Sequence, residues 1–219
     1  MVAEYNEHME RAEPFHIQNT PHSLTLSSLP FCRRLYIDPK ACIKTKRASL
    51  VANQRIWINS KWGQRNLVVF TDGSKTDRAA GWAIRGIHAG RLVFSHKVPL
   101  AVRASNHDAE MMALAHASRL VRDTMLRTLD IREFHIFSDS TAALTSIFDP
   151  APHAAQQASL LFRTNMLQLF SQRKDVEGQL QWTPGHSGLD HMTITDKNAK
   201  AAANRVIASG QYLLPVTTR

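Results

Sequence analysis

The clearest pattern along the chain is a series of short apolar runs that begins at residue 67. LVVFT (67–71), AAGWAIRG (79–86) and RLVFSHKV (91–98) are rich in β-branched and aromatic residues and are separated by glycine-containing turn signals. FHIFSDS (134–140) and LQWTP (180–184) are two later runs of the same kind. The first three runs predict an antiparallel meander, and the last two predict strands that alternate with helices.

Helical periodicity fills the segments between the later strands. Apolar residues at Met111, Leu114, Val121 and Met125 predict a helix over 106–126, whose start Ser105 or Asn106 is able to cap. Three further helices are predicted, namely a short one in TAALTSIF (141–148), an amphipathic one over 155–172 and an alanine-rich one over 195–209. Together these elements predict an α/β fold with a mixed five-stranded sheet, an antiparallel meander plus parallel strands, flanked by helices.

The first 65 residues are much less patterned. They contain four prolines and show no sustained period of 2 or 3.6 residues, so at most short helices are expected there. We interpret residues 1–65 as a basic leader or linker, or as the remnant of a larger polyprotein. The folded domain is expected over 66–210, with a short tail at 211–219.

The positive net charge favours a polyanionic partner but does not identify it. The formal net charge is +9 and the sequence pI is about 10.0. Basic residues are concentrated in 33–65, where Asp38 is the single acid. We expect this segment to help hold a nucleic acid, so deleting residues 1–65 should weaken binding and flatten its dependence on salt.

Other classes of protein are disfavoured by the composition. Cys32 and Cys42 have neither CxxC spacing nor paired histidines at zinc-finger spacing, so reduced thiols are expected rather than a structural zinc site. The apolar runs are too short to span a bilayer, and the first residues are too acidic and polar for a secretory signal. We therefore expect an intracellular protein, nuclear or cytoplasmic, with no membrane association.

Four carboxylates stand at predicted element ends, and they carry the candidate chemistry: Asp72, Glu110, Asp139 and Asp196. A carboxylate among apolar residues is costly to bury unless a cation compensates its charge. Hard oxygen ligands suit Mg²⁺ or Mn²⁺ rather than zinc. Two such ions, held roughly 4 Å apart by shared carboxylates, are able to activate water and stabilise the leaving oxygen of a phosphodiester.

Each acid also has a simpler interpretation when it is taken alone. Asp72 in TDGS is typical of a turn, Asp139 and Asp196 are able to cap helices, and Glu110 is able to complement a helix dipole. Four independent coincidences explain the set less well than one site does. The sequence therefore favours a divalent metal site, and Gly73 would leave room there for a substrate backbone.

These residues and their flanking motifs resemble a known family. TDGS (71–74), SNHDAEMMAL (105–114), FSDSTAAL (137–144) and the stretch from WTPGHSG to Asp196 are similar to type 1 ribonuclease H domains, especially those of non-LTR retrotransposon reverse transcriptases. The resemblance covers residues 67–209. It implies endonucleolytic hydrolysis of the RNA strand in RNA/DNA hybrids, with 5′-phosphate and 3′-hydroxyl products and two Mg²⁺ ions, or Mn²⁺, as cofactors.

The resemblance also implies a role for each matching residue. The four acids become the metal ligands, with Asp72 bridging both ions. His186 of GHSG matches a histidine that assists proton movement or product release, although an exposed loop histidine without the motif usually has no such role. Four residues match substrate contacts: Gly73, Ser74, Asn106 and Ser140. The implied partners are an RNA/DNA hybrid and a reverse transcriptase domain within a larger polyprotein, and a monomer is expected.

Two departures from the family pattern keep alternatives open. Relatives commonly carry an Asn-Glu pair where this chain has Met192 and Thr193. A catalytically silent nucleic-acid-binding domain of the same fold, left from a retrotransposon, is therefore one alternative. A transposase or integrase acting on DNA is the other, although such enzymes usually rely on three acids and lack the GHSG motif.

Overall fold

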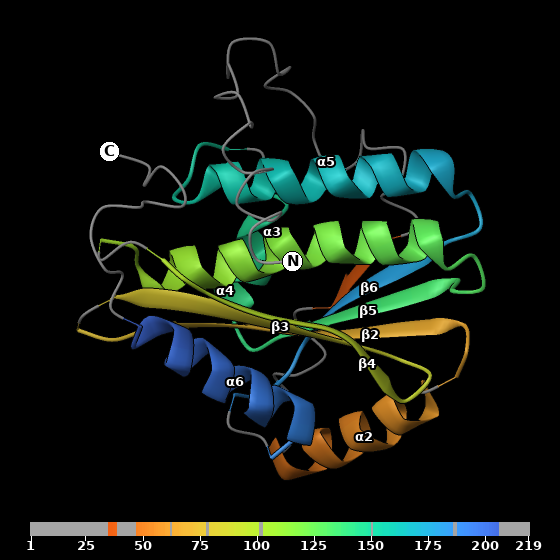
Figure 1. Ribbon diagram of the computed structural model, residues 1–219, viewed down its shortest axis with the longest axis horizontal. Helices are drawn as coiled ribbons and strands as arrows, with labels where there is room; N and C mark the ends of the chain where they lie inside the picture. The colour runs from red at the N-terminus through yellow and green to blue at the C-terminus, as the bar shows by residue number, and fades with distance from the viewer. Residues whose placement is uncertain are drawn as a thin grey trace.

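A mixed sheet with helices on both faces makes up the described part of the chain (Figure 1). The computed structural model describes residues 35–38, 47–61, 63–77, 79–100, 103–149, 151–185 and 188–205. Six strands in the order β1-β6-β5-β2-β3-β4 form the sheet. Their bounds are β1 Leu35–Asp38, β2 Asn66–Lys75, β3 Ala80–His88, β4 Arg91–Pro99, β5 Glu133–Ser138 and β6 Glu177–Trp182.

The pairing of the strands agrees with the sequence pattern. β2, β3 and β4 form the predicted antiparallel meander, while β5 runs parallel to β2 and β6 runs parallel to β5. These five strands confirm the predicted mixed sheet. β1 adds a sixth strand at the edge, parallel to β6, with Leu35 opposite Gly178.

The helices are α2 Arg47–Ser60, α3 Asn106–Arg127, α4 Thr141–Ser146, α5 Gln156–Gln172 and α6 Asp190–Ala203. α3 begins where the sequence places it because Ser105 caps it. The Ser105 hydroxyl accepts a hydrogen bond from the Asp108 amide, and the Asp108 carboxylate accepts one from the Ser105 amide, which forms a capping box. α4 and α5 also lie within a residue or two of their predicted bounds.

Two expectations about the elements are wrong. The leader was expected to hold at most short helices, yet it contributes both β1 and the 14-residue helix α2. α2 has only a weak apolar stripe, and its buried residues Gln54 and Ile58 lie one turn apart against the rest of the domain. The last helix begins at Asp190 rather than 195. In both cases tertiary packing stabilises helix that local sequence signals alone do not predict.

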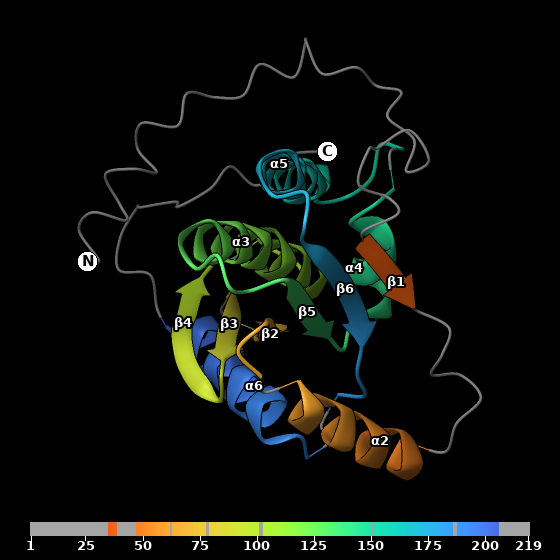
Figure 2. The ribbon, with the colours of Figure 1, turned by 90° about the vertical axis from the view of Figure 1, so that its right-hand side faces the viewer.

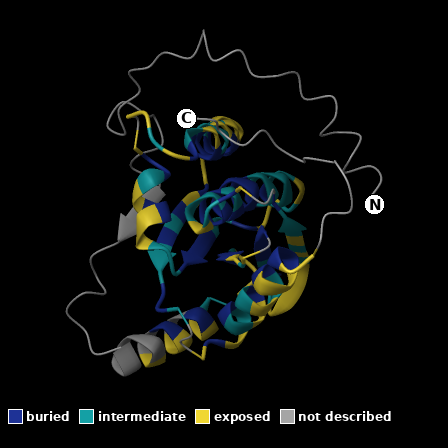
Figure 3. Cartoon of the chain, turned by 90° about the vertical axis from the view of Figure 1, so that its left-hand side faces the viewer, coloured by how far each residue is buried: buried dark blue, intermediate teal, exposed yellow. Residues whose placement is uncertain are grey.

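The two faces of the sheet are covered differently (Figures 1 and 2). α3 packs on one face, with α5 on the outer side of α3, and this half holds the larger core. As predicted, Met111 and Leu114 are fully buried there. α6 and α2 lie against the other face (Figure 2). Exposed residues lie on the outward sides of the helices and along the edge strand β4 (Figure 3). Among the described residues, no helix is both long and apolar enough to cross a membrane.

A smaller apolar cluster lies beneath α2 and the start of α6. Phe70 and Phe137 come from neighbouring strands and stack with ring centroids 5.4 Å apart. The cluster, here called the lower core, consists of Ile58, Val68, Phe70, Ile87, Phe137, Leu189 and Met192. It joins the sheet to both helices on this face.

Two glycines let helices approach the sheet closely. A Cβ at Gly73 would lie 2.4 Å from the Glu110 amide nitrogen of α3. A Cβ at Gly81 would lie 2.5 Å from the Ala203 amide nitrogen of α6. Real Cβ atoms are not found at such distances from backbone, so glycine at these positions sets how near α3 and α6 lie to the strands that carry the site.

Candidate metal centre

The strand register brings two of the predicted acids side by side. The parallel pairing of β2 with β5 ends at Phe70 opposite Phe137. Asp72 and Asp139 each follow two residues later on parallel strands, so they lie side by side just beyond the last paired residues of β2 and β5. The Thr71 hydroxyl donates a hydrogen bond of 2.9 Å to the Phe137 carbonyl and ties the two strands together at this point.

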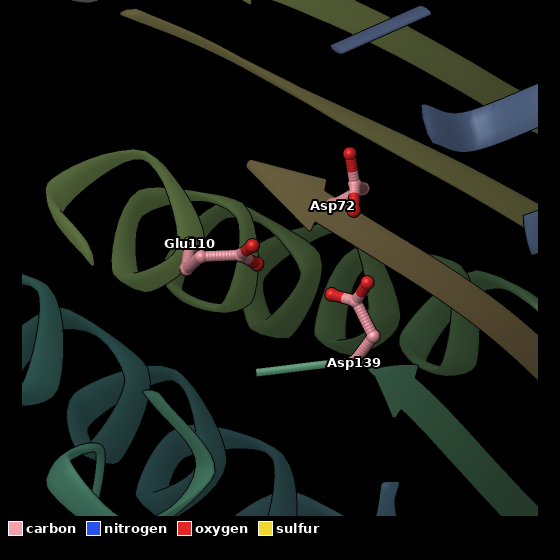
Figure 4. A group of neighbouring side chains, drawn as sticks. All are labelled: Asp72, Glu110 and Asp139. Carbon is pink, nitrogen blue, oxygen red and sulfur yellow. The ribbon is translucent and has the colours of Figure 1, made fainter. Parts of the chain in front are cut away.

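Glu110 reaches the same place from α3. It is the fifth residue of the helix, and Gly73 allows the helix backbone to lie against β2 at this level. One carboxylate oxygen each from Asp72, Glu110 and Asp139 lies within 4.8 Å of the others, and Figure 4 shows the three side chains converging. Three residues distant in sequence thus form one cluster.

The structure removes the simpler interpretations of the individual acids. Asp72 is within β2, opposite Ala83 of β3, and is not a turn residue. Ser140, not Asp139, caps α4, because its hydroxyl accepts a hydrogen bond of 3.2 Å from the Ala143 amide. Asp196 lies inside α6, whose N-cap is Leu189, so its predicted position at the start of a helix is wrong.

Burial and mutual repulsion make this cluster unfavourable to ionise. Burial, and then the negative charges of Asp139 and Asp196, raise the pKa of Asp72 to about 8. Burial, followed by the charges of Asp72 and Asp139, raises the pKa of Glu110 well above its usual range, and a hydrogen bond from the Gly73 amide opposes this in part. Asp72 and Glu110 are each only 4% exposed. Ionised carboxylates here therefore need a compensating cation.

The residues fit a divalent metal ion. Asp72 Oδ2 and Glu110 Oε2 are buried, and within the described part of the chain neither atom has a hydrogen-bond partner. Unpaired buried oxygens are costly, and an oxygen-preferring cation satisfies them while it offsets the repulsion. The donor set contains neither a thiolate nor an imidazole, which favours Mg²⁺ or Mn²⁺ over zinc.

Asp196 lies nearby but is engaged in a different way. It is not part of the three-residue cluster, although it is near enough for its charge to raise the pKa of Asp72. Its two carboxylate oxygens each lie 2.8 Å from Nζ of Lys200, one helical turn further along α6. A role for Asp196 as the fourth ligand stays a prediction.

The predicted substrate residues occupy different settings. Asn106 is exposed at the first position of α3, and because Ser105 caps that helix, its side chain is not needed for the cap. Ser74 is buried in β2 and Ser140 caps α4. The space beside Gly73 is taken by α3 rather than left open. His186 lies outside the described residues.

Sequence reasoning missed two residues that support the acids. The Trp182 indole N–H donates a hydrogen bond of 2.8 Å to the Asp139 carbonyl, so this aromatic residue both packs on the core and fixes the backbone of a ligand. Lys200 pairs with Asp196, and its spacing of four residues on a helix was the signal that could have revealed it. Trp82, by contrast, is a core residue.

Met192 has a clear structural explanation. It is 4% exposed and packs in the lower core beside Leu189 and Phe137. A polar residue at this position would be buried in apolar surroundings at a cost. The departure from the family pattern therefore serves packing between α6 and the sheet in this chain.

The three clustered carboxylates lie beside the central strands β2 and β5 of the mixed sheet. The RNase H family profile matches residues 64–204, about two thirds of the chain. The chain belongs to the RNase H family, a family of ribonuclease enzymes.

Solved structures with the same fold are only distantly similar in sequence. The foamy viral protease–reverse transcriptase in complex with an RNA/DNA hybrid aligns with 65% of this chain and 20% of its own, at 15% identity and a TM-score of 0.52. The N-terminal RNase H domain of a Mycobacterium tuberculosis protein, fused to maltose-binding protein, aligns with 64% of this chain and 99% of its own, at 17% identity and 0.48. RNase H1 from Halobacterium salinarum aligns with 63% of this chain and 96% of its own, at 16% identity and a TM-score of 0.44. No curated protein matches.

Proposed function

We propose that this protein hydrolyses the RNA strand of RNA/DNA hybrids with two divalent metal ions, Mg²⁺ or Mn²⁺, and leaves 5′-phosphate and 3′-hydroxyl ends. The observation that carries the proposal is the convergence of Asp72, Glu110 and Asp139 within 4.8 Å on the fold of the RNase H family. Asp196 is proposed as a fourth ligand. The bound ions would activate water and stabilise the leaving oxygen of the phosphodiester.

Backbone and side-chain contacts hold two of the proposed ligands, Asp72 and Asp139, in place. β2 and β5 hold Asp72 and Asp139 on rigid backbone, and the Trp182 indole fixes the Asp139 carbonyl. Because the pKa of Asp72 is raised to about 8 without a cation, ion binding at neutral pH displaces protons from the cluster. We therefore expect metal affinity to increase with pH up to about 8.

The substrate proposal rests on the same site. The foamy viral neighbour was solved with an RNA/DNA hybrid, which supports this substrate class for the present chain. Asn106, which is exposed one turn before Glu110, is proposed to contact the hybrid. Ser74 and Ser140, which follow Asp72 and Asp139 within two residues, are proposed as further substrate contacts. Contact with a 2′-hydroxyl would distinguish the RNA strand from the DNA strand. Association with a reverse transcriptase domain is proposed on the family resemblance.

The test is cleavage of an end-labelled RNA/DNA hybrid in the presence of Mg²⁺, beside the Asp139→Asn variant. We expect metal-dependent cuts in the RNA strand and a loss of at least about 100-fold in the variant. Binding of the hybrid without cleavage would reject the enzyme and favour a silent binding domain. Cleavage of duplex DNA would favour a transposase-like or integrase-like enzyme.

A further inference from the structure

Helix α2 lies outside the family match, yet it contacts the chain on both sides of the connection between β6 and α6. The family match begins at residue 64, whereas α2 spans Arg47–Ser60. Figures 1 and 2 show α2 beside α6 on the same face of the sheet. The connection links the Asp139-supporting strand β6 to the helix that carries Asp196, so its ends bear on the site.

Gln54 holds the first end of this connection. Its side-chain amide donates a hydrogen bond of 2.7 Å to the Trp182 carbonyl. Its side-chain oxygen accepts a hydrogen bond of 2.8 Å from the Thr183 hydroxyl. Gln54 is 8% exposed and Thr183 is fully buried. A buried amide with both of its functions paired to consecutive residues is specific in orientation, because loss of either bond leaves a buried polar group unpaired.

Arg55 holds the second end. Its guanidinium donates a hydrogen bond of 2.8 Å to the carbonyl of Gly188. Gly188 has a φ of +73°, a conformation that glycine adopts without strain. The next residue, Leu189, is the N-cap of α6, and its side chain is buried in the lower core with Ile58 of α2. One helix therefore contacts both residues that immediately precede α6.

We propose that α2 is a positioning element of the active site, in which Gln54 and Arg55 fix the two ends of the segment between β6 and α6. That segment leads directly into α6, the helix that carries Asp196. The inference rests on the proposed function for its catalytic consequence. The anchoring itself rests only on the contacts of α2.

Hydrogen exchange tests the anchoring without any reference to activity. In the full chain, the backbone amides of residues 183, 185, 188 and 189 are expected to exchange about fivefold faster or more in the double variant Gln54→Ala/Arg55→Ala than in the wild type. Amides of β2 and β5 should be unchanged. Ile56→Ser is the matched control on the same helix, because Ile56 is 70% exposed. Equal exchange in the double variant and the wild type would overturn the anchoring.

Kinetics test the consequence for the site. The double variant should lose about tenfold or more in kcat, with little change in KM for the hybrid, because ligands are misplaced rather than substrate contacts removed. Arg55→Lys keeps a donor and should recover most of the loss caused by Arg55→Ala. An unchanged kcat together with faster exchange would overturn the catalytic role of α2.

The two proposals fail in distinguishable ways. A wild-type protein that binds but does not cleave the hybrid would reject the proposed function, while the exchange result still decides the anchoring. A variant that has lost kcat, with a melting temperature far below that of Ile56→Ser and faster exchange across the whole sheet, would show general destabilisation and overturn a specific positioning role.

Discussion

At the residue scale, the site depends on buried carboxylates that are unfavourable without a cation. Asp72 and Glu110 are nearly inaccessible to water, and each has an unpaired oxygen among the described residues. Residues kept at such a cost to stability are typical of functional sites. The same cost makes their contribution to stability dependent on pH and on metal.

Asp72→Asn is expected to stabilise the metal-free protein at pH 9. The pKa of Asp72 is about 8 in the folded protein against 3.8 ordinarily, so its contribution to stability falls as the pH rises from about 4 to about 8. The variant carries no charge and avoids this loss. Thermal melting at pH 5 and pH 9 without metal measures the effect, and a lower melting temperature of the variant at pH 9 would contradict it.

Addition of Mg²⁺ should raise the melting temperature of the wild type at pH 8, because the ion binds the folded site and not the unfolded chain. Asp72→Asn should lose most of this shift. Lys61→Ala is a suitable control, since Lys61 pairs with Glu133 at a distance of 2.8 Å and takes no part in the acidic cluster. An equal rise of the melting temperature in all three proteins would show that the metal binds at a different site.

Gly73→Ala should destabilise the protein by about 2 kcal/mol, because the added methyl group would collide with the α3 backbone at Glu110. Gly63→Ala is the matched control. Its added Cβ would meet nothing nearer than 3.7 Å, the distance to Asn66 Nδ2. Urea unfolding of both variants checks the difference, and equal midpoints would contradict the close approach of α3 to β2.

At the element scale, α3 does more than supply Glu110. It also carries His116, which is 4% exposed and stacks on Trp82 of β3 with ring centroids 4.6 Å apart. Burial, and then the positive charges of Arg119 and His96, lower the pKa of His116 to about 3. The packing of this helix on the sheet therefore requires a neutral imidazole.

Acid should weaken the packing of α3. A depressed pKa means that the stability contributed by neutral His116 is present above the ordinary value of 6.5 and is lost as the pH falls toward about 3, at about 1.4 kcal/mol per pH unit. His116→Phe keeps the stacking and should flatten the decline in stability between pH 6.5 and pH 4.5. Part of the decline should remain in this variant, because the pKa of His135 is also lowered, to about 4. Denaturant unfolding across this range measures both slopes.

At the scale of the whole molecule, the segment before residue 66 supplies the edge strand β1, helix α2 and a set of basic residues. α2 covers the lower core through Ile58 and contacts the chain before α6. The remaining basic residues of the segment are the basis of the predicted salt dependence of hybrid binding. Deleting residues 1–65 as a whole would remove all of these together, so a change in binding would have more than one cause.

Two truncations separate these contributions. Removal of residues 1–46 deletes six basic residues and the four-residue edge strand β1 but keeps α2, so it should reduce the salt dependence of hybrid binding with a smaller loss of stability than a truncation that also removes α2. Removal of residues 1–63 should in addition lower the melting temperature, because it uncovers Phe137, Leu189 and Met192. Binding titrations at several salt concentrations and thermal melting distinguish the two. Equal melting temperatures would show that α2 contributes no stability.

The sequence by itself determined the strands β2 to β6, the helices α3 to α5 and the acids. Its signals are local: β-branched and aromatic runs in the strands, period 3.6 in α3, and a capping residue at Ser105. The family resemblance predicted that the four acids belong to one metal site.

Only the tertiary structure decided which acids meet and what supports them. The register of β2 against β5 aligns Asp72 with Asp139, and Gly73 admits the α3 backbone that brings Glu110 to them. α2 escaped sequence analysis because its stability comes from contacts with Trp182, Thr183 and Gly188, more than a hundred residues away along the chain. Such contacts leave no local periodic signal, since they depend on where distant elements are placed by the fold.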